Sequence, residues 1–273
     1  MRRVVPHSLL IAGALVMLYP LVWMAAGSLK TTDEIFSGVG LLPRQPSLDN
    51  YTSGWTALGI DFGHFFVNSF IVSLAAVAGN TISCSMAAYA FARLRFRFKR
   101  LWFALMLVSI MLPIHVLIIP QYTLFHGLGW VDTFLPLTVP KFLAVDGFFI
   151  FLMVQFIRGL PTELDDAARI DGCGPVQIYL RIILPLMAPA LVTTAIFTFI
   201  WTWDDFFSQL VYLSDVDHYT VPMALRAFLD SSGDSSWGAM FAMATLSLIP
   251  VLVFFLVFQR RITEGISTTG LKG

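Results

Sequence analysis

Hydrophobic residues gather along the chain in six long runs, which short polar segments separate. The runs lie at approximately 8–28, 64–92, 101–120, 134–157, 186–213 and 236–259. Crossing the apolar core of a bilayer takes about 20 residues of α-helix. The runs approach or exceed that length, and they lack the alternation over about ten residues that marks a barrel strand. The pattern therefore predicts an all-α, polytopic membrane protein with six transmembrane helices in a single domain, residues 1–273.

Composition supports a membrane protein. Hydrophobic residues make up 57% of the chain and charged residues 12%, the chain contains 25 Phe, and the mean hydropathy is +0.78. A soluble fold of this size cannot hide so much apolar surface. These values argue against a soluble enzyme, a disordered protein and a nucleic-acid binder. The two cysteines, Cys84 and Cys173, are too few and too far apart to indicate a disulfide framework or a metal cluster.

The basic residues predict the orientation. The positive-inside rule places loops rich in Lys and Arg in the cytoplasm, which here gives an N-in, C-in topology. Because Arg2 and Arg3 precede a long apolar run that five others follow, we interpret the first run as an uncleaved anchor. The basic residues on the predicted inner side are Arg2, Arg3, Arg93, Arg95, Arg97, Lys99, Arg100, Arg158, Arg169, Arg181, Arg260, Arg261 and Lys272.

A polar insertion at residues 159–185, on the inner side, separates the fourth and fifth runs. Thr162 can cap a short helix, with Asp165 three residues later as in a capping box. Asp165 and Arg169 have the i, i+4 spacing of a helical ion pair. Gly172 can end the helix in a left-handed conformation, and Pro175 suits the first turn of a second helix. The insertion is thus predicted to be a short helix, a tight turn and another short helix.

One face of the first short helix is predicted to be small and smooth. Leu164, Ala167 and Ala168 have the spacing that places side chains on one side of a helix. Such a face suits a partner groove that approaches closely. An ordinary interhelical loop lying on the membrane surface is an equally acceptable interpretation, since short amphipathic helices have many uses.

The residues of the insertion also carry a family resemblance. Asp166-Ala167-Ala168, then Gly172, then Ile182 with Leu184-Pro185, is similar to the EAA loop of binding-protein-dependent ABC importer permeases, with Asp166 where that family usually has Glu. The resemblance covers nearly the whole chain and is strongest to the carbohydrate, MalG-like branch. Further matching segments are Asn68-Ser69, 88–93, 120–122 and the tail 259–273.

The resemblance implies the permease subunit of a type I ATP-driven importer that carries a sugar or sugar-like solute into the cytoplasm. The whole chain would be one permease domain and not an enzyme, and residues 159–185 would couple it to a separate ATPase. The implied ATPase-coupling residues are Glu163, Asp165, Asp166, Ala167, Ala168, Asp171, Gly172 and Pro185, and the implied tail contacts to the ATPase are Leu271, Lys272 and Gly273.

The resemblance also implies the partners and the location. The partners are a second homologous permease, two cytoplasmic ATPase subunits, an extracytoplasmic solute-binding protein and membrane lipid, with no nucleic acid. ATP and Mg²⁺ would bind the ATPase subunits, and this chain would hold no cofactor. The location would be the cytoplasmic (inner) membrane of a bacterium or archaeon, with several passes.

Polar side chains inside the apolar runs are candidates for the substrate pathway, because ionisable groups in a membrane are costly. Rings suit stacking on sugars, and carboxylates accept hydrogen bonds from hydroxyls, although an interfacial aromatic belt with structural acids gives the same pattern. The charged pair in the fourth run can line the pathway, meet a partner permease or simply mark the outer end of a helix. The candidates are Trp201, Trp203, Asp204, Asp205, Lys141, Asp146 and, with a weaker signal, Tyr122 and Gln121.

Two other classes of protein remain as alternatives. An ion-coupled secondary transporter would use Asp204 and Asp205 as coupling sites, but such carriers usually show internal repeats, which this sequence lacks. An integral membrane enzyme is the third class, and its catalytic constellation is missing. The sequence also has no metal-binding His-Glu-x-x-His and no phosphate-binding Gly-x-x-x-x-Gly-Lys-Ser/Thr motif, so we expect no ATP hydrolysis by this chain alone.

Overall fold

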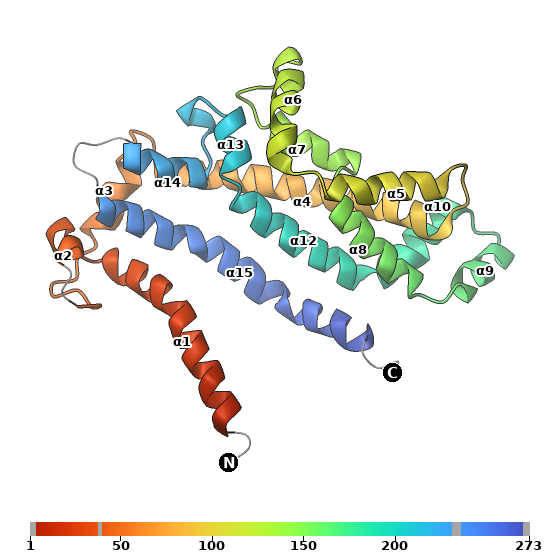
Figure 1. Ribbon diagram of the computed structural model, residues 1–273, viewed down its shortest axis with the longest axis horizontal. Helices are drawn as coiled ribbons and strands as arrows, with labels where there is room; N and C mark the ends of the chain where they lie inside the picture. Colours follow the sequence, from red (N-terminus) through yellow and green to blue (C-terminus); the bar gives the residue numbers. More distant parts are fainter. Residues whose placement is uncertain (1–3, 38–39, 231–235, 270–273) are drawn as a thin grey trace. The chain divides into compact units, whose positions relative to one another are not determined.

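The computed structural model describes residues 4–37, 40–230 and 236–269, and the regular structure of these residues is entirely helical. This confirms the all-α prediction. The chain forms two compact units, one of residues 1–67 and 220–250 and the other of residues 68–219 and 251–273. The division falls inside two long helices, α4 (Phe62–Arg93) and α15 (Trp237–Thr269) (Figure 1). The single permease domain stays a prediction.

The first unit contains α1 (Val4–Gly27), α2 (Thr32–Phe36), α3 (Asp49–Thr56), α14 (Val221–Asp230) and the first parts of α4 and α15. Its core is aromatic: the ring of Phe62 lies 5.6 Å from that of Phe65 and 6.2 Å from that of Phe228. All three side chains are fully buried. The pair of Phe62 and Phe65 is edge-to-face, a geometry that adds to the burial of apolar area.

A polar contact fixes the segment that follows α1. The side-chain amide of Asn50 donates to the backbone oxygens of Ser28 (2.8 Å) and Lys30 (2.7 Å). Backbone carbonyls at a helix end need such partners when they are buried. Gly238 lies so close to the Asn50 amide that a Cβ there would clash with it. The start of α15 therefore packs directly on α3.

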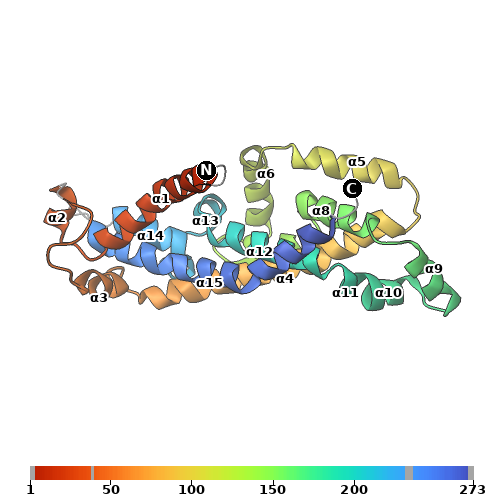
Figure 2. The same ribbon diagram turned by 90° about the horizontal axis from the view of Figure 1, so that it is seen from below.

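The second unit holds the remaining helices. Within it α5 packs on α8, and α8 packs on α12. Figures 1 and 2 both place α9 at the end of the unit where α4 terminates. The elements are α5 (Lys99–Ile110), α6 (Ile114–Gly127), α7 (Leu135–Thr138), η1 (Val139–Leu143), α8 (Gly147–Arg158), α9 (Glu163–Ile170), α10 (Pro175–Ile178), η2 (Tyr179–Ile183), α11 (Leu184–Leu186), α12 (Ala188–Trp203), α13 (Phe207–Tyr212) and η3 (Val216–His218).

The predicted spans are only partly continuous. Four stretches are long and apolar enough to cross a membrane: Pro6–Gly27, Phe62–Arg93, Leu135–Arg158 and Trp237–Gln259. Two helix pairs are bent at a break. Lys99–Ile110 and His115–Gly127, at 105°, cover the third predicted run, whereas Pro175–Leu186 and Ala188–Trp203, at 74°, join the end of the insertion to the fifth run. Proline explains the breaks, because it removes a backbone donor: Pro113 immediately precedes α6, and α12 begins Ala188-Pro189. The described residues thus give four spans, or six if each bent pair crosses once.

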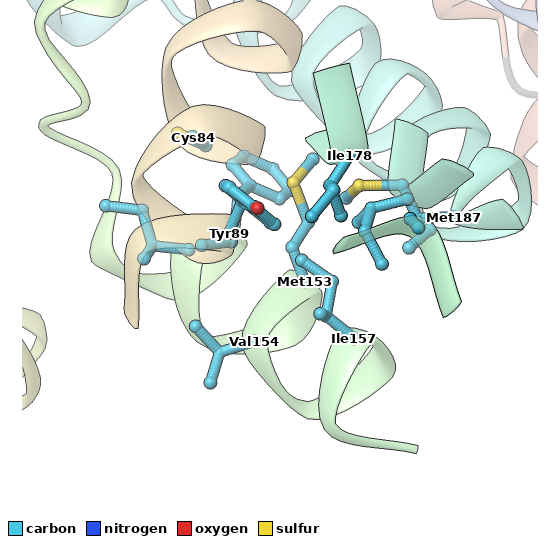
Figure 3. Close-up of a cluster of buried hydrophobic side chains, with 13 residues drawn as sticks. Cys84, Tyr89, Met153, Val154, Ile157, Ile178 and Met187 are labelled. Carbon is cyan, nitrogen blue, oxygen red and sulfur yellow. The ribbon is translucent and has the colours of Figure 1, made fainter. Parts of the chain in front are cut away.

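The core of the second unit joins α4, α8 and the 159–185 insertion. Tyr89 of α4, Met153 and Ile157 of α8, Ile178 of the insertion and Met187 just after it meet in one buried cluster (Figure 3). The side chains of Met153, Ile157 and Met187 are 0% exposed. The insertion is therefore packed into the fold and is not a loop lying free at its surface.

Candidate functional site

The insertion has the local structure that its turn residues predict. Helix α9 ends before a tight turn in which Gly172 has a φ of +83°, a left-handed conformation that favours glycine. Pro175 is the first residue of α10. The backbone N–H of Gly174 donates to the side-chain oxygen of Gln177 at 2.9 Å and so closes the start of α10. The predicted helix, turn and second helix are confirmed.

Two predicted contacts in α9 are wrong. The Thr162 side chain makes no capping hydrogen bond. Arg169 does not pair with Asp165; its guanidinium lies 2.7 Å from Asp166, an exposed pair three residues apart. Asp165 instead points into the protein, where its carboxylate lies 3.3 Å from Nε of Arg93 at the end of α4. A buried cation is a stronger partner for a buried carboxylate than a solvated one on the same helix.

The predicted coupling residues fall into two sets. The carboxylate of Asp165 and the methyl group of Ala168 are buried, at 2% and 5% exposure, so Ala168 belongs to the core and not to a smooth outer face with Ala167. Two large apolar side chains of the insertion are exposed instead, Ile170 of α9 at 87% and Val176 of α10 at 69%. The predicted coupling residues that face outward are Glu163, Asp166, Ala167, Asp171, Gly172 and Pro185.

A second polar group lies among the apolar helices of the second unit. The ammonium of Lys141 on η1 contacts a carboxylate oxygen of Asp146 at 2.9 Å, and the amide of Asn80 on α4 donates to the same oxygen. Asn80 also donates to the hydroxyl of Thr198 on α12, at 3.2 Å. The hydroxyl of Ser83 donates to the backbone oxygen of Lys141 at 2.7 Å. The carboxylate of this partly buried pair is thus compensated by the ammonium of Lys141 and the amide of Asn80.

The ion pair lines a cavity of about 350 Å³. Asp205, predicted for the same pathway, lines it too, and its carboxylate accepts the backbone N–H of Ser208 at 3.0 Å. The cavity thus brings together four of the predicted pathway residues, Gln121, Lys141, Asp146 and Asp205, from three parts of the chain. Its polar and charged lining residues are Ser109, Gln121, Lys141, Asp146, Asp205, Ser208 and Tyr212.

The other predicted pathway residues lie elsewhere. Trp203 is 2% exposed and stacks on Phe199 with 5.5 Å between ring centres, which is a packing role. Trp201 is half exposed and contacts the ring of Phe148 at 5.6 Å. Asp204 is exposed and lies outside the cavity lining. Tyr122 stacks against a histidine of its own helix instead of facing the cavity; its neighbour Gln121 is the lining residue.

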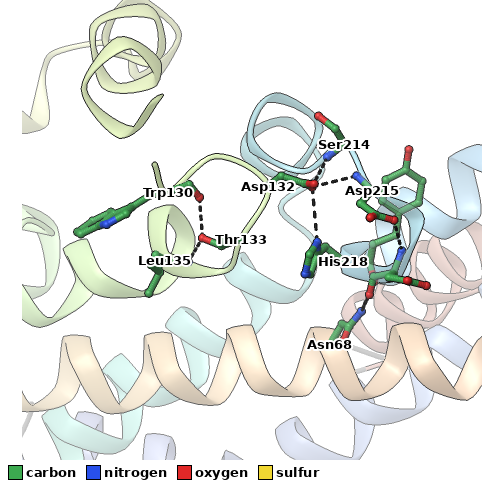
Figure 4. A network of polar contacts seen from close by, with 10 residues as sticks. Asn68, Trp130, Asp132, Thr133, Leu135, Ser214, Asp215 and His218 are labelled. Atoms are coloured by element: carbon green, nitrogen blue, oxygen red, sulfur yellow. Dashed lines mark hydrogen bonds and ion pairs between the residues drawn. The ribbon is translucent and has the colours of Figure 1, made fainter. Parts of the chain in front are cut away.

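A carboxylate clamp, formed by Asp132 and its partners, joins two turns of the second unit (Figure 4). One oxygen of Asp132 accepts the backbone N–H groups of Ser214 and Asp215, both at 2.9 Å, and lies 3.6 Å from Nδ1 of His218. The hydrogen bonds from the Asp215 and Ser214 backbone, aided by the nearby imidazole, hold the pKa of Asp132 below its usual value.

The same cluster has the residue types of a metal site. Asp132, Asp215 and His218 bring one oxygen or nitrogen atom each to within 4.8 Å of one another. The clamping oxygen of Asp132 already accepts two backbone donors, however, so the arrangement is explained as a structural link between turns. The predicted tail contacts, Leu271, Lys272 and Gly273, lie outside the described residues.

Sequence reasoning missed several residues of both sites. Arg93 and Tyr89 on α4 contact the insertion, and Asn80 and Ser83 on the same helix contact the ion pair. The available signal was their polarity inside an apolar run. In the sequence Arg93 indicates topology and, within 88–93, the family resemblance, and nothing in the second run indicates that its small polar residues contact the fourth.

Apolar helices of spanning length with a polar cavity among them define a multi-pass membrane protein. Residues 79–268 match the family described as binding-protein-dependent transport system inner membrane component. The chain belongs to this family of ABC importer permeases, as the sequence resemblance indicates.

Individual relatives match along almost the full length. The chain is 31% identical to the trehalose/maltose transport system permease protein MalG of Thermococcus litoralis over 99% of both chains. It is 34% identical to the trehalose transport system permease protein SugB of Mycobacterium tuberculosis, covering 94% of this chain and 93% of that one. A crystal structure of a bacterial ABC transporter involved in import of the polysaccharide alginate superposes with a TM-score of 0.80 at 23% identity, over 94% of this chain and 95% of the other, which shows the type I importer permease fold.

Proposed function

We propose that this chain is the membrane permease subunit of an ATP-driven importer for a sugar or sugar-like solute, and that α9 couples it to a separate ATPase. ATP and Mg²⁺ would bind two cytoplasmic ATPase subunits, and closure of those subunits would switch the permease between inward-open and outward-open states. A second homologous permease and an extracytoplasmic solute-binding protein complete the assembly. We place it in the cytoplasmic membrane of a bacterium or archaeon.

The observation that carries this proposal is the exposed surface of the insertion. Ile170 and Val176 are among its most exposed side chains, although both are large and apolar. Their neighbours Glu163, Asp166 and Ala167 are exposed too. Large apolar side chains exposed in an otherwise polar segment indicate a surface that a partner protein covers, because a solvated loop gains nothing from exposing them. We infer that an ATPase cleft covers it.

The same proposal includes six spans with both ends in the cytoplasm. The support is the distribution of charge: Arg93, Arg95, Arg97, Lys99 and Arg100 lie close together just before or at the start of α5. Translocating such a basic group is strongly unfavourable. The tail contacts of Leu271, Lys272 and Gly273 belong to the proposal by resemblance alone.

For the solute path we propose the cavity beside the Lys141–Asp146 pair. Its carboxylates and amide can accept and donate hydrogen bonds to hydroxyl groups, and Tyr212 and Phe148 add ring surface. The named relatives suggest carbohydrate, since the two permeases above serve trehalose and maltose. A relative from Agrobacterium fabrum that is 29% identical serves sn-glycerol 3-phosphate, which keeps a sugar phosphate within the range of solutes.

The test is uptake by the complete assembly in liposomes, with a panel of sugars and sn-glycerol 3-phosphate. We expect uptake only with ATP inside the liposomes and with the solute-binding protein outside. Ala167→Arg, which adds a bulky cation to the exposed face of α9, abolishes uptake while the permease stays in the membrane. Arg97→Gln is the matched control at an exposed site on the same side. Uptake that follows an ion gradient without the ATPase subunits would instead establish a secondary transporter.

A further inference from the structure

Three side chains of α4 form a polar seam along the insertion. Ser85, Tyr89 and Arg93 are spaced four residues apart, so they share one face of the helix. The Ser85 hydroxyl lies 2.8 Å from that of Tyr179 on η2, and the Tyr89 hydroxyl donates to the backbone oxygen of Pro175 on α10 at 3.0 Å. These two contacts hold the second arm of the insertion, which is the part formed by α10 and η2.

Arg93 holds the first arm of the insertion, which is formed by α9 and the residues just before it. Its guanidinium donates to the backbone oxygen of Leu160 at 2.8 Å and lies 3.3 Å from the carboxylate of Asp165 in the first turn of α9. The two charged side chains are only 6% and 3% exposed. The other oxygen of Asp165 is buried and makes no hydrogen bond within the described residues. Asp165 therefore depends on Arg93, because a buried charge without its partner is strongly unfavourable.

The seam is backed by apolar packing on the same face of α4. Tyr89 contacts the ring of Tyr179 with 5.3 Å between centres, and Ala88 is buried in the cluster that also contains Ala168 and Ile178. Both arms of the insertion thus rest on the last turns of one helix. The peptide links to α8 and α12 are the alternative routes for a force that enters at α9.

We infer that the seam makes the inner end of α4 and the two arms of the insertion move as one body, with Arg93 as the positioning residue that fixes the orientation of α9. This inference rests on the proposed function, since it gives the route by which the ATPase moves the membrane helices. Arg93 contacts no solute or nucleotide in this role. It acts through Asp165, whose carboxylate it holds against the end of α4.

The test measures solute transported per ATP hydrolysed by the complete assembly in liposomes. Arg93→Gln lowers this ratio by about tenfold, because α9 still seats in the ATPase but no longer drives α4. The reversed pair Arg93→Asp with Asp165→Arg recovers part of the ratio, which a general loss of packing would not allow. Arg97→Gln is the control, because it removes the same charge from an exposed side chain, and it leaves the ratio unchanged.

Tyr89→Phe is the second variant, because it removes only the hydroxyl that meets Pro175. We expect it to lower the ratio by about twofold to threefold, a loss in the range of one hydrogen bond. An Arg93→Gln assembly with the wild-type ratio overturns the inference, and so does a wild-type ratio in Tyr89→Phe if Arg93→Gln fails to assemble. Failure of the wild-type assembly to import solute with ATP would overturn the proposed function itself, so the two failures are distinguishable.

Discussion

The ion pair beside the cavity allows a prediction that separates structure from transport. We consider Lys141→Met, which keeps most of the side-chain length and removes the charge. In the wild-type protein the ammonium lies 2.9 Å from Asp146, and the two side chains are 29% and 28% exposed. The substitution leaves the Asp146 carboxylate with the amide of Asn80 as its remaining side-chain donor within the described residues.

The magnitude follows from the distance and the exposure. Two unit charges at that separation attract by about 1.4 kcal/mol in water and by about 6 kcal/mol at an effective dielectric constant of about 20. Because the pair is only partly buried and Asn80 still compensates the carboxylate, we expect Lys141→Met to cost about 2–3 kcal/mol. For a chain of this size that corresponds to a fall in Tm of about 4–10 °C.

The double substitution Lys141→Met with Asp146→Asn removes both charges and retains an acceptor for Asn80. Its stability is expected within about 1 kcal/mol of the wild type, since no uncompensated charge remains. Thermal unfolding of the permease in detergent measures both variants, with Arg44→Met as the control for losing an exposed cation. An unchanged Tm for Lys141→Met would refute the reasoning.

Uptake by the complete assembly then separates the two roles of the pair. If the pair is only structural, the double variant recovers transport together with stability. If the pair lines the solute path, the double variant recovers its Tm and remains slow in uptake. Comparing the two measurements on one variant removes the usual ambiguity between a misfolded and an inactive transporter.

Three further predictions concern backbone geometry and pH. Gly172→Val places a branched side chain at a φ of +83°, costs about 1–2 kcal/mol locally and lowers ATP-driven uptake, with membrane insertion measured in parallel as the control. Gly79→Val lowers Tm by an amount equivalent to about 1–3 kcal/mol, because even a Cβ there would lie 2.9 Å from the backbone of η1. Asp132→Asn lowers Tm at pH 7 by about 2–4 °C, because neutral hydrogen bonds replace charge-assisted ones. Since the clamp holds the Asp132 pKa below its unfolded value, its stabilisation is present above pH about 3.9 and disappears as the pH falls through the folded value. The Tm values of the wild type and the variant therefore converge in acid, and a gap that stays constant with pH would contradict this account.

The sequence was sufficient where the chemistry is local. Gly172 and Pro175 predict the turn and the second short helix because their backbone preferences act on their own residues, whatever surrounds them. The apolar runs predict helices because backbone groups in a bilayer must form their hydrogen bonds within the segment. The sizes of the bends that precede α6 and α12 were not predicted, because they depend on packing that no single run encodes.

Contacts between distant segments were beyond the sequence alone. The spacing of Asp165 and Arg169 favours a pair on one helix, yet Asp165 turns inward because Arg93, far away in the chain, is buried beside it. Trp203 and Asp205 belong to one short stretch and have different surroundings, a packed core and a cavity. Spacing in sequence predicts which side chains share a helix face, but it does not say what the face meets.

The exposure of α1 bears on how the protein is made. Of the apolar stretch Pro6–Gly27, only 6% of the most hydrophobic window is buried within the chain, and the ring of Trp23, near its end, meets Phe241 of α15 at 5.2 Å. The ribosome produces α15 long after α1. Before α15 is made, α1 therefore lacks that contact, and its long stretch without Lys, Arg, Asp or Glu suits it to enter lipid on its own.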